Sequence, residues 1–486
     1  MSDASPMPVT EAFRTTAPFA FFDYLRIPYR VDPSAGAREL RGAELAVAIR
    51  PAGDPWPGLL WPSSGASLEA PRPFRWGEMR LFGSLIPDVA AVVSRLPGRW
   101  EAADDLLDPA GSVIASIWRE EGGSILIPFD PGDVMRSFWT EAYREHGGGR
   151  GGAFRRLALR TYYLLRPLIP RRIQIAMRRR YARAQELPDF PRWPAEPSLH
   201  DLYRRLYDFA REVAGTEVPW IGFWPARASW AVVLTHDIET AAGRDATLPI
   251  VDLEAQFGFR SAWNVVPRRY EVSDKFIASM TDRDCEVGLH GLFHDGRDLA
   301  SRDHLLERLP EMRAVASRIG ATGFRSPATQ RAPELIGLLG FDHDSSYPDS
   351  DPYEPQPGGC GTWLPYTIQG TIELPITLPQ DHTLFVILQQ VDERVWIDKV
   401  DALRRRGGMA LVLTHPDYLL DPAIRAAYAR LIAHLADDTG AWRTLPSEVS
   451  AWWRARGQST PVRMEGEWRI SGPAANEGRL RLDPPD

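Results

Sequence analysis

The sequence predicts an α/β protein whose main domain, residues 228–457, is built on a parallel sheet that is either open or closed into a barrel. In this region apolar segments rich in β-formers alternate with longer segments of helical character. Repeated strand–helix units give parallel strands, because each helix returns the chain to the same edge of the sheet. Two strands also end in nearly the same polar string, AVVLTHDIET at 231–240 and ALVLTHPD at 410–417. Buried strands that end in titratable groups indicate that this edge of the sheet carries a functional site.

The elements expected in this domain follow one another in βα order. Strands are expected at 230–236, 260–266, 285–289, 322–325, 342–346, 371–376, 409–414 and 442–445. Helices are expected near 246–257 and 273–280, and at 302–319, 332–339, 393–406 and 421–438.

The remaining residues form three further segments, in keeping with the two or three domains that 486 residues suggest. Residues 1–146 combine short apolar runs with Pro- and Gly-rich turns, and we expect a smaller N-terminal α/β or mostly β domain without an assigned role. Residues 147–227 are expected to be an Arg-rich helical linker or brace. Residues 458–486 form a tail that could add a small β hairpin.

The composition, 44% hydrophobic and 25% charged, is that of a globular protein, and the net charge of −7 argues against general nucleic-acid binding. Two cysteines, Cys285 and Cys360, cannot form a disulfide framework, which indicates a reducing compartment. The N-terminus lacks the features of a signal peptide, and no window holds about 18 consecutive apolar residues. We therefore expect a cytoplasmic protein, and the sequence leaves its oligomeric state open.

Residues 150–185 contain eleven arginines and no Asp or Glu. Apolar and aromatic residues lie between them, and Pro167 and Pro170 interrupt any long amphipathic helix. One interpretation is a helical brace whose arginines pair with acidic neighbours. The other is a surface, formed by residues 150–183, for an anionic membrane or a phosphate-bearing substrate, which would place the protein at the membrane periphery.

Titratable residues follow five of the expected strands. Because the carboxyl ends of parallel strands lie at one edge of a sheet or barrel, their side chains are expected to meet in one site. In chain order these residues are Asp237 and Glu239, His290 and His294, Arg325, Asp344, and His415.

His290 and His294 have the H-x3-H spacing that brings two imidazoles to one face of a helix or turn. Two imidazoles and a carboxylate make a three-point metal site that leaves positions open for water, as hydrolytic zinc requires. Asp237 and Glu239 lie two residues apart, which in extended chain turns both side chains to the same face. One carboxylate could bind the metal while the other acts as general base.

His415 is the candidate general acid, since a hydrolase must protonate its leaving group and histidine titrates in the useful range. Asp344 could orient or charge that imidazole, and Arg325 could hold the base ionised by pairing with it. Arg325 and Asp344 could instead form a buried salt bridge that braces the sheet. His236 points to the opposite face from Asp237 and is interpreted as structural.

Taken together, these motifs resemble those of the polysaccharide deacetylase family, carbohydrate esterase group four. THDIE is similar to the first family motif, LHGLFH to the second, FRSP to the third, HDSSYPD to the fourth and LTHPD to the fifth, within residues 228–455. The resemblance implies a distorted (β/α)7 barrel, a divalent metal that is usually zinc, and hydrolysis of an N- or O-acetyl group from a sugar.

The resemblance also implies roles for single residues. Asp237 would be the base, His290 and His294 metal ligands, Arg325 the residue that orients the base, and His415 the acid, supported by Asp344. The commonest first motif has two adjacent aspartates, whereas Ile238 follows Asp237 here. We therefore assign Glu239 as the third metal ligand, with Asp237 as the alternative.

Three functions follow as hypotheses. The leading one is a zinc-dependent hydrolase that deacetylates a sugar or glycan precursor. The second keeps the barrel and the metal but cleaves a C–N bond in a small cyclic amide or ureide. The third is a catalytically inactive module that binds glycans. An open groove would suit a polymer, and a closed pocket a small molecule.

Overall fold

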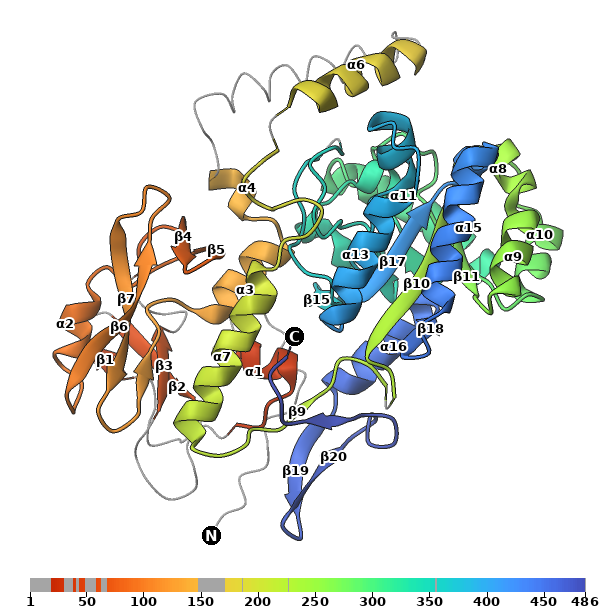
Figure 1. The fold of residues 1–486 in the computed structure, drawn as a ribbon. Helices are drawn as coiled ribbons and strands as arrows, with labels where there is room; N and C mark the ends of the chain where they lie inside the picture. The colour runs from red at the N-terminus through yellow and green to blue at the C-terminus, as the bar shows by residue number, and fades with distance from the viewer. Residues whose placement is uncertain are drawn as a thin grey trace. The chain divides into compact units, whose positions relative to one another are not determined.

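The computed structural model describes residues 19–29, 38–40, 43–48, 58–62, 68–146, 171–185, 187–225, 227–354 and 356–485 (Figure 1). The chain forms two compact units. Unit 1 comprises residues 1–146, 197–226 and 452–486, and unit 2 comprises residues 147–196 and 227–451. This division differs from the four consecutive segments expected from the sequence, because two later stretches of chain join the N-terminal domain.

The buried side chain of Arg456 shows why these distant stretches belong to one unit. It donates hydrogen bonds to the carbonyl oxygens of Tyr24 at 2.8 Å and Ile221 at 2.8 Å, and so joins three parts of the chain. The neighbouring ring of Trp453 lies 5.9 Å from Tyr24 and 6.3 Å from Phe223, centroid to centroid. Contacts between residues so far apart leave no signal in the local composition.

Unit 1 is built on a mainly antiparallel sheet in the order β1-β2-β3-β8-β7-β6-β4-β5, in which β3 and β8 are parallel. These strands are β1 (Arg38–Leu40), β2 (Ala43–Ala48), β3 (Leu59–Pro62), β4 (Arg72–Trp76), β5 (Met79–Gly83), β6 (Trp100–Leu107), β7 (Val113–Glu120) and β8 (Ile125–Leu126). The helices are α1 (Ala20–Leu25), α2 (Val89–Val93), α3 (Pro131–Trp139), α4 (Tyr143–His146) and α7 (Ser198–Ala214). In the C-terminal tail β19 (Thr460–Met464) and β20 (Glu467–Ser471) form an antiparallel hairpin, and β21 (Leu480–Arg481) pairs with β9 (Trp220–Ile221).

Unit 2 follows the βα order expected from the sequence. Its strands are β10 (Trp230–Ile238), β11 (Ser261–Val265), β12 (Glu286–Leu289), β13 (Gly323–Phe324), β14 (His343–Asp344), β15 (Tyr366–Ile368), β16 (Thr371–Glu373), β17 (Met409–Thr414) and β18 (Ala441–Thr444). Its helices are α6 (Arg171–Ala184), α8 (Ala241–Asp245), α9 (Thr247–Gln256), α10 (Asp274–Thr281), α11 (Arg302–Ile319), α12 (Pro333–Leu339), α13 (Arg394–Arg405), α14 (Pro416–Leu419) and α15 (Pro422–Ala436), with α16 (Pro446–Gly457) after β18. A 3-10 turn η3 (Pro327–Thr329) and a π-helical turn η4 (His382–Ile387) complete it. Among the described residues, no helix is both long and apolar enough to span a bilayer.

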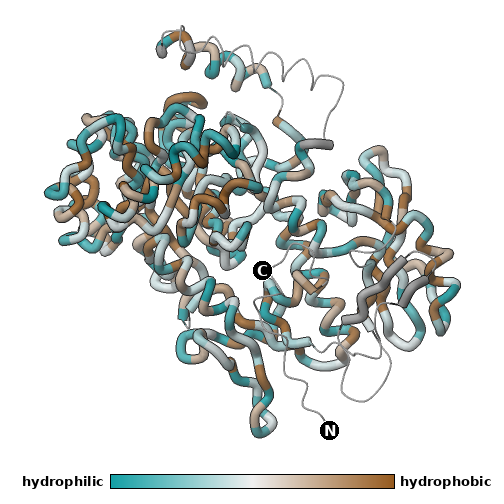
Figure 2. Tube along the Cα trace, turned by 180° about the vertical axis from the view of Figure 1, so that it is seen from behind, coloured by the Kyte–Doolittle hydropathy of each residue, from teal (hydrophilic) through white to brown (hydrophobic). Residues whose placement is uncertain are grey.

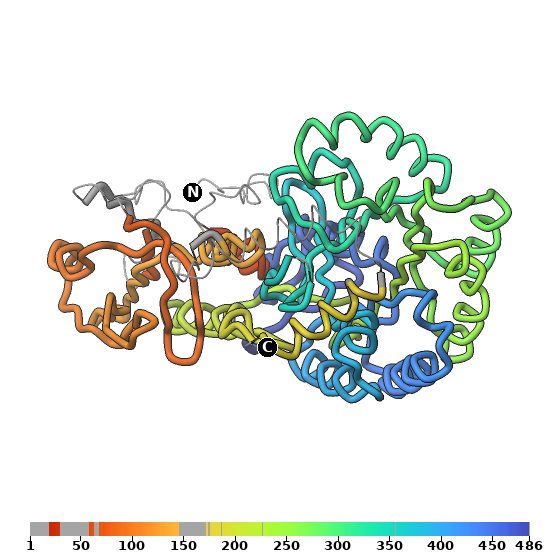
Figure 3. Tube along the Cα trace, turned by 90° about the horizontal axis from the view of Figure 1, so that it is seen from above, coloured from red at the N-terminus to blue at the C-terminus, as the bar shows by residue number. Residues whose placement is uncertain are grey.

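The sheet of unit 2 is mainly parallel and curled. Parallel neighbours run in the order β16-β14-β13-β12-β11-β10-β17, β18 pairs with β10, and β15 is the antiparallel exception beside β16. Helices surround this sheet (Figures 1 and 3). All residues of β10 and β17 are therefore buried, which explains their continuous apolar sequence.

The two ends of this sheet approach each other through the chain that leaves β16. The hydroxyl of Thr377 donates to the carbonyl oxygen of Met409 at 2.7 Å, and the N–H of Leu378 donates to Leu411 at 3.2 Å. The sheet is consequently curled into a half-barrel. Its closure as a seven-unit (β/α) barrel stays a prediction.

The Arg-rich segment is described in part. Residues 147–170 lie outside the described residues, and residues 171–184 form α6, along which hydrophobic and hydrophilic residues alternate (Figure 2). Arg178 donates to the carbonyl oxygen of Tyr353 at 3.1 Å, and Arg179 donates to that of Val386 at 2.8 Å. These contacts hold α6 against the loops of unit 2, and Figure 3 shows the helix in yellow crossing this end of the unit.

Candidate metal and catalytic site

The loops at the carboxyl ends of the unit 2 strands enclose a pocket with an empty volume of about 560 Å³, part of it open to solvent. All site residues expected from the sequence line it, except Arg325 and Asp344. The lining residues are Arg178, Asp237, Glu239, His290, His294, Ala328, Thr329, Glu354, Gln380, His382, Leu413, His415 and Tyr418.

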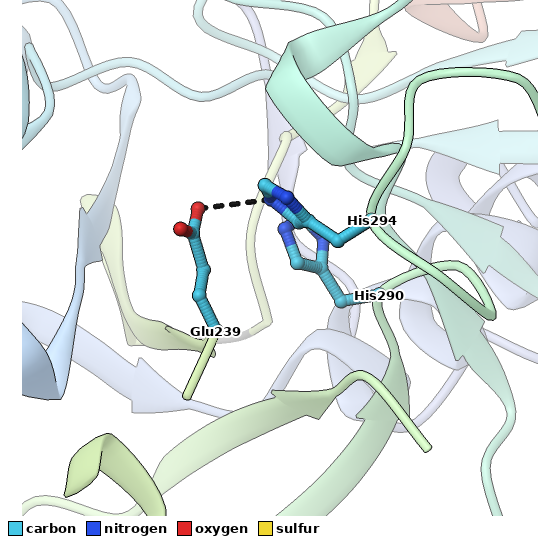
Figure 4. Close-up of side chains that lie close together, drawn as sticks. All are labelled: Glu239, His290 and His294. Carbon is cyan, nitrogen blue, oxygen red and sulfur yellow. Dashed lines mark ion pairs between the residues drawn. The ribbon is translucent and has the colours of Figure 1, made fainter. Parts of the chain in front are cut away.

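Glu239, His290 and His294 place three donor atoms within 4.8 Å of one another. Figure 4 shows Glu239, at the end of β10, facing the two histidines, which come from the loop after β12. Nε2 of His294 lies 2.9 Å from Oε1 of Glu239, yet this buried nitrogen has no hydrogen bond of acceptable geometry to any described residue. A shared cation would satisfy both atoms, so these residues fit a divalent metal ion.

His290 is oriented for metal binding by its other ring nitrogen. Nδ1 lies 3.0 Å from the carbonyl oxygen of Arg325. Since a carbonyl can only accept, Nδ1 carries the proton and Nε2 keeps its lone pair for a metal. Burial lowers the pKa of His290 to about 4, so the imidazole is neutral near pH 7, the form that binds metal ions.

Asp237 lies beside these three residues as an ionised carboxylate. Its Oδ1 accepts hydrogen bonds from Asn264 at 2.9 Å and Arg325 at 3.1 Å, and its Oδ2 lies 3.6 Å from Nε2 of His290. Burial alone would raise the pKa of Asp237, but its interaction with His290 and the positive charge of Arg325 outweigh burial and lower it below the usual value. The arrangement can therefore supply a proton acceptor next to the three metal donors.

Arg325 holds the carboxylate of Asp237, and hydrogen bonds to Thr235 and Ser345 hold Arg325 itself. Its guanidinium donates to the hydroxyl of Thr235 at 2.9 Å and to the carbonyl and hydroxyl of Ser345 at 2.7 and 2.8 Å. The side chain is fully enclosed. The sequence presents a salt bridge between Arg325 and Asp344 as the alternative, whereas among the described residues Arg325 forms its ion pair with Asp237.

His415 faces the three donors from β17, with Nε2 3.7 Å from Oε1 of Glu239. Its Nδ1 lies 2.7 Å from Oδ1 of Asp381, and its backbone N–H donates to Oδ2 of the same carboxylate at 2.7 Å. Burial alone would lower the pKa of His415, but Asp381 and Glu239 raise it to about 10. The imidazole is therefore protonated near pH 7. The sequence favours Asp344 as its partner, and this expectation needs correction because Asp381 occupies that position.

Asp344 lies outside the pocket because it is still part of a strand. In β14 it stands opposite Glu373 of β16, and its Oδ1 accepts a hydrogen bond from the hydroxyl of Ser346 at 2.7 Å. Burial raises the pKa of Asp344, and burial together with repulsion from Asp344 raises that of Glu373 well above its usual value. Two buried carboxyl groups in contact are not both ionised, so this pair joins strands within the sheet.

Alternation along β10 separates the polar residues of its C-terminal end. Thr235 and Asp237 face Arg325, whereas His236 points to the other side and stacks on Trp263 with 3.9 Å between ring centroids. His236 also hydrogen-bonds to Thr414 and Glu254, at 2.8 Å each. This environment agrees with the interpretation of His236 as structural.

Three residues that line the pocket have backbone φ angles in the left-handed region, which residues other than glycine rarely adopt. Ala328 and Thr329 have φ angles of 56° and 48°, and His294 has a φ angle of 55°. For a β-branched residue such as Thr329 the left-handed region is especially unfavourable. Strain of this kind is typical of functional sites, where the surrounding structure enforces it.

Comparison with known proteins finds similarity only in three dimensions, since no protein-family model and no curated protein matches the chain. A candidate polysaccharide deacetylase from Mycobacterium smegmatis matches 50% of this chain and 96% of its own, at 20% identity and a TM-score of 0.41. Puue allantoinase matches 48% and 92%, at 17% identity and a TM-score of 0.37. The peptidoglycan deacetylase PdaC from Bacillus subtilis matches 47% and 93%, at 16% identity and a TM-score of 0.32.

Several residues of the site were missed by reasoning from the sequence. Asp381 stands in the segment LPQDH, shortly after the expected strand 371–376, and a carboxylate beside a histidine at a strand end was a usable signal. Asn264, near the end of β11, gave a weaker signal of the same kind. Arg178 belongs to the Arg-rich segment, which the sequence offered only as a brace or an anion-binding surface, and Glu354 gave no signal because it lies in a loop.

Proposed function

We propose that this chain is a hydrolase that depends on a divalent metal ion and removes an N- or O-acetyl group from a sugar or glycan precursor. One observation carries the proposal: a Glu-His-His donor set, an ionised carboxylate and a protonated imidazole converge in one pocket. Hydrolysis of an acetyl group requires an activated water molecule, a proton acceptor and a proton donor, and this combination supplies all three.

Glu239, His290 and His294 would hold the ion, which we propose to be zinc because two imidazoles and one carboxylate form a donor set that zinc accepts. When bound, the ion lowers the pKa of a water molecule and polarises the acetyl carbonyl. Three protein donors leave coordination positions open for water and substrate.

Asp237 is the proposed general base. Its Oδ1 is engaged by Asn264 and Arg325, so Oδ2 is the oxygen available to take a proton from the attacking water. The low pKa of Asp237 keeps the carboxylate ready to accept that proton at neutral pH. A positioned base contributes about 10²–10⁴-fold to a hydrolytic rate.

His415 is the proposed general acid. Asp381 holds its Nδ1 and keeps the ring cationic, so Nε2 carries a proton that can pass to the departing nitrogen or oxygen of the sugar. Because Nε2 is close to Glu239, the proton is delivered beside the three metal donors, where the acetyl bond breaks.

The rest of the pocket suits a single sugar unit. Glu354, Gln380 and His382 supply polar groups for hydroxyls, and the ring of Tyr418 lies 5.5 Å from that of His382.

The deciding experiment measures the metal content and acetate release of the purified protein beside His290→Ala/His294→Ala. We expect about one tightly bound divalent ion per chain in the wild type and none in the variant. Acetate release would then be screened with N-acetylated and O-acetylated sugars, with a cyclic ureide tested in parallel for ring opening.

The matched control is His304→Ala/His434→Ala, which removes two histidines outside the pocket and should leave metal content unchanged. If the wild type bound no ion after zinc, cobalt and nickel were offered, the hydrolase proposal would be abandoned for the inactive glycan-binding module.

A further inference from the structure

Helix α6 borders the catalytic pocket and is held against unit 2 along one side. Arg178 lines the pocket and bonds to the loop at Tyr353, and Arg179 bonds to the end of η4 at Val386. Arg183, one turn further on, hydrogen-bonds to Gln389. The side of α6 that carries these arginines therefore faces the functional edge of the sheet.

The opposite side of α6 exposes large apolar side chains. Met177 precedes Arg179 by two residues, about 200° around a helix of 3.6 residues per turn. Ile173 lies one turn before Met177 on the same face. Ile173 and Met177 are 51% and 47% exposed, and Tyr181, one turn later, is 51% exposed. Apolar side chains gathered on an outward face indicate an interaction surface.

The arginines of α6 whose side chains the structure describes have no carboxylate as a salt-bridge partner among the described residues. Arg179 and Arg183 bond to neutral oxygens, and within the described parts of the chain neither they nor Arg172 and Arg180 form an ion pair. Arg180 is exposed on the apolar face, seven residues after Ile173, whereas Arg172 is exposed on the side of Arg179, seven residues before it. Positive charge is concentrated here, because residues 150–185 contain eleven arginines in a chain whose net charge is −7.

We propose that the outer face of α6, formed by Ile173, Met177 and Arg180, docks on an anionic phospholipid surface. Apolar residues between arginines are typical of a helix that lies in the plane of a membrane. Since the rest of the chain is net negative, attraction to anionic headgroups has to come from this segment. Docking would bring the pocket that Arg178 lines to the bilayer, where, if the proposed hydrolase function holds, a lipid-linked acetylated sugar reaches it.

Co-sedimentation of the full chain with vesicles tests this surface without any substrate, so its outcome is independent of catalysis. We expect binding at low salt to vesicles of phosphatidylcholine with phosphatidylglycerol, and none to phosphatidylcholine alone. Arg180→Gln should weaken binding about five-fold, because an arginine near an anionic surface contributes a factor of about five. Ile173→Ser/Met177→Ser should weaken binding by roughly tenfold or more for each side chain that leaves the bilayer.

The matched control is Leu306→Ser/Leu420→Ser, which alters two other apolar side chains of unit 2 that are 44% and 51% exposed. This control should bind vesicles as the wild type does, and retained metal content would show that each variant is folded. A wild type that stays in the supernatant, or an Ile173→Ser/Met177→Ser variant that binds undiminished, overturns the proposal. The proposal is also overturned if light scattering shows that the apolar face of α6 is the contact of a dimer.

Discussion

The carboxylate of Asp381 contacts His415 twice, through the ring Nδ1 at 2.7 Å and through the backbone N–H at 2.7 Å. The first contact fixes the position of the ring proton, and the second fixes the carboxylate relative to the end of β17. Because Asp381 is buried and negatively charged beside the imidazole, it stabilises the cationic ring and raises the pKa of His415.

Replacement of Asp381 by Asn should remove this charge while preserving the shape of the side chain. We expect kcat for acetate release to fall on the order of 100-fold, since the variant loses a protonated general acid at neutral pH. The high-pH limb of the kcat profile should move to lower pH. In the metal-loaded wild type the midpoint of that limb should lie below pH 10, because a cation bound at Glu239 repels the protonated ring of His415. The measurement is kcat against pH for the metal-loaded enzymes.

Asp344→Asn is the control for this experiment, because it changes an equally buried carboxyl group that does not contact His415. Its high-pH limb should coincide with that of the wild type. A shift in Asp344→Asn without one in Asp381→Asn would contradict the assignment made from the structure.

Loss of the charge of Glu239 should lower the metal content, whereas loss of the charge of Asp237 should lower kcat. Glu239→Gln should lower the metal content measured by elemental analysis, because Glu239 is the only anionic donor in the set of three. Asp237→Asn should retain the metal and lose about 10²–10⁴-fold in kcat, as expected for a general base. If Asp237→Asn lost the metal and Glu239→Gln kept it, the two roles would have to be exchanged.

Removal of Arg325 should destabilise the fold as well as the site. Arg325→Ala leaves the buried charge of Asp237 without its partner, which costs about 3–5 kcal/mol of unfolding free energy. Urea denaturation of Arg325→Ala and of Arg325→Ala/Asp237→Ala checks this. The double variant should lose less than the sum of the single losses, because the second change removes the unpaired charge. Equal stability of Arg325→Ala and the wild type would show that this pair does not brace the sheet.

The metal-free protein should lose stability at high pH through His415. Its pKa of about 10 in the folded chain exceeds the ordinary 6.5, so its contribution is complete below pH 6.5 and is lost as pH rises towards 10. Urea denaturation in chelator across this range should show the decline in the wild type and a smaller one in His415→Gln.

Through His290, the metal-free protein should lose stability at low pH. Its pKa is lowered to about 4, so its contribution to stability is complete above pH 6.5 and is lost as pH falls towards 4. His290→Gln should therefore flatten the acid side of the same stability curve. A variant with the same acid dependence as the wild type would mean that the buried imidazole does not control it.

Most of the site could be predicted from the sequence because its signals are local. The apolar run that forms β10 and the H-x3-H spacing of His290 and His294 are fixed by neighbouring residues. Parallel strands bring their carboxyl ends to one edge whatever the strand order. The sequence therefore determined the α/β repeats and five of the residues that line the pocket, Asp237, Glu239, His290, His294 and His415.

Only the tertiary structure decided which of these side chains touch. Asp344 lies at the end of one expected strand, and Asp381 lies shortly after another. No spacing rule shows which of the two is the partner of His415, which lies 34 residues beyond Asp381. The choice depends on whether a carboxylate is still held within the sheet, as Asp344 is, or lies in the loop beyond it. Likewise Arg178 reaches the pocket because α6 packs across its edge, a contact made by chain path and side-chain packing rather than by local sequence.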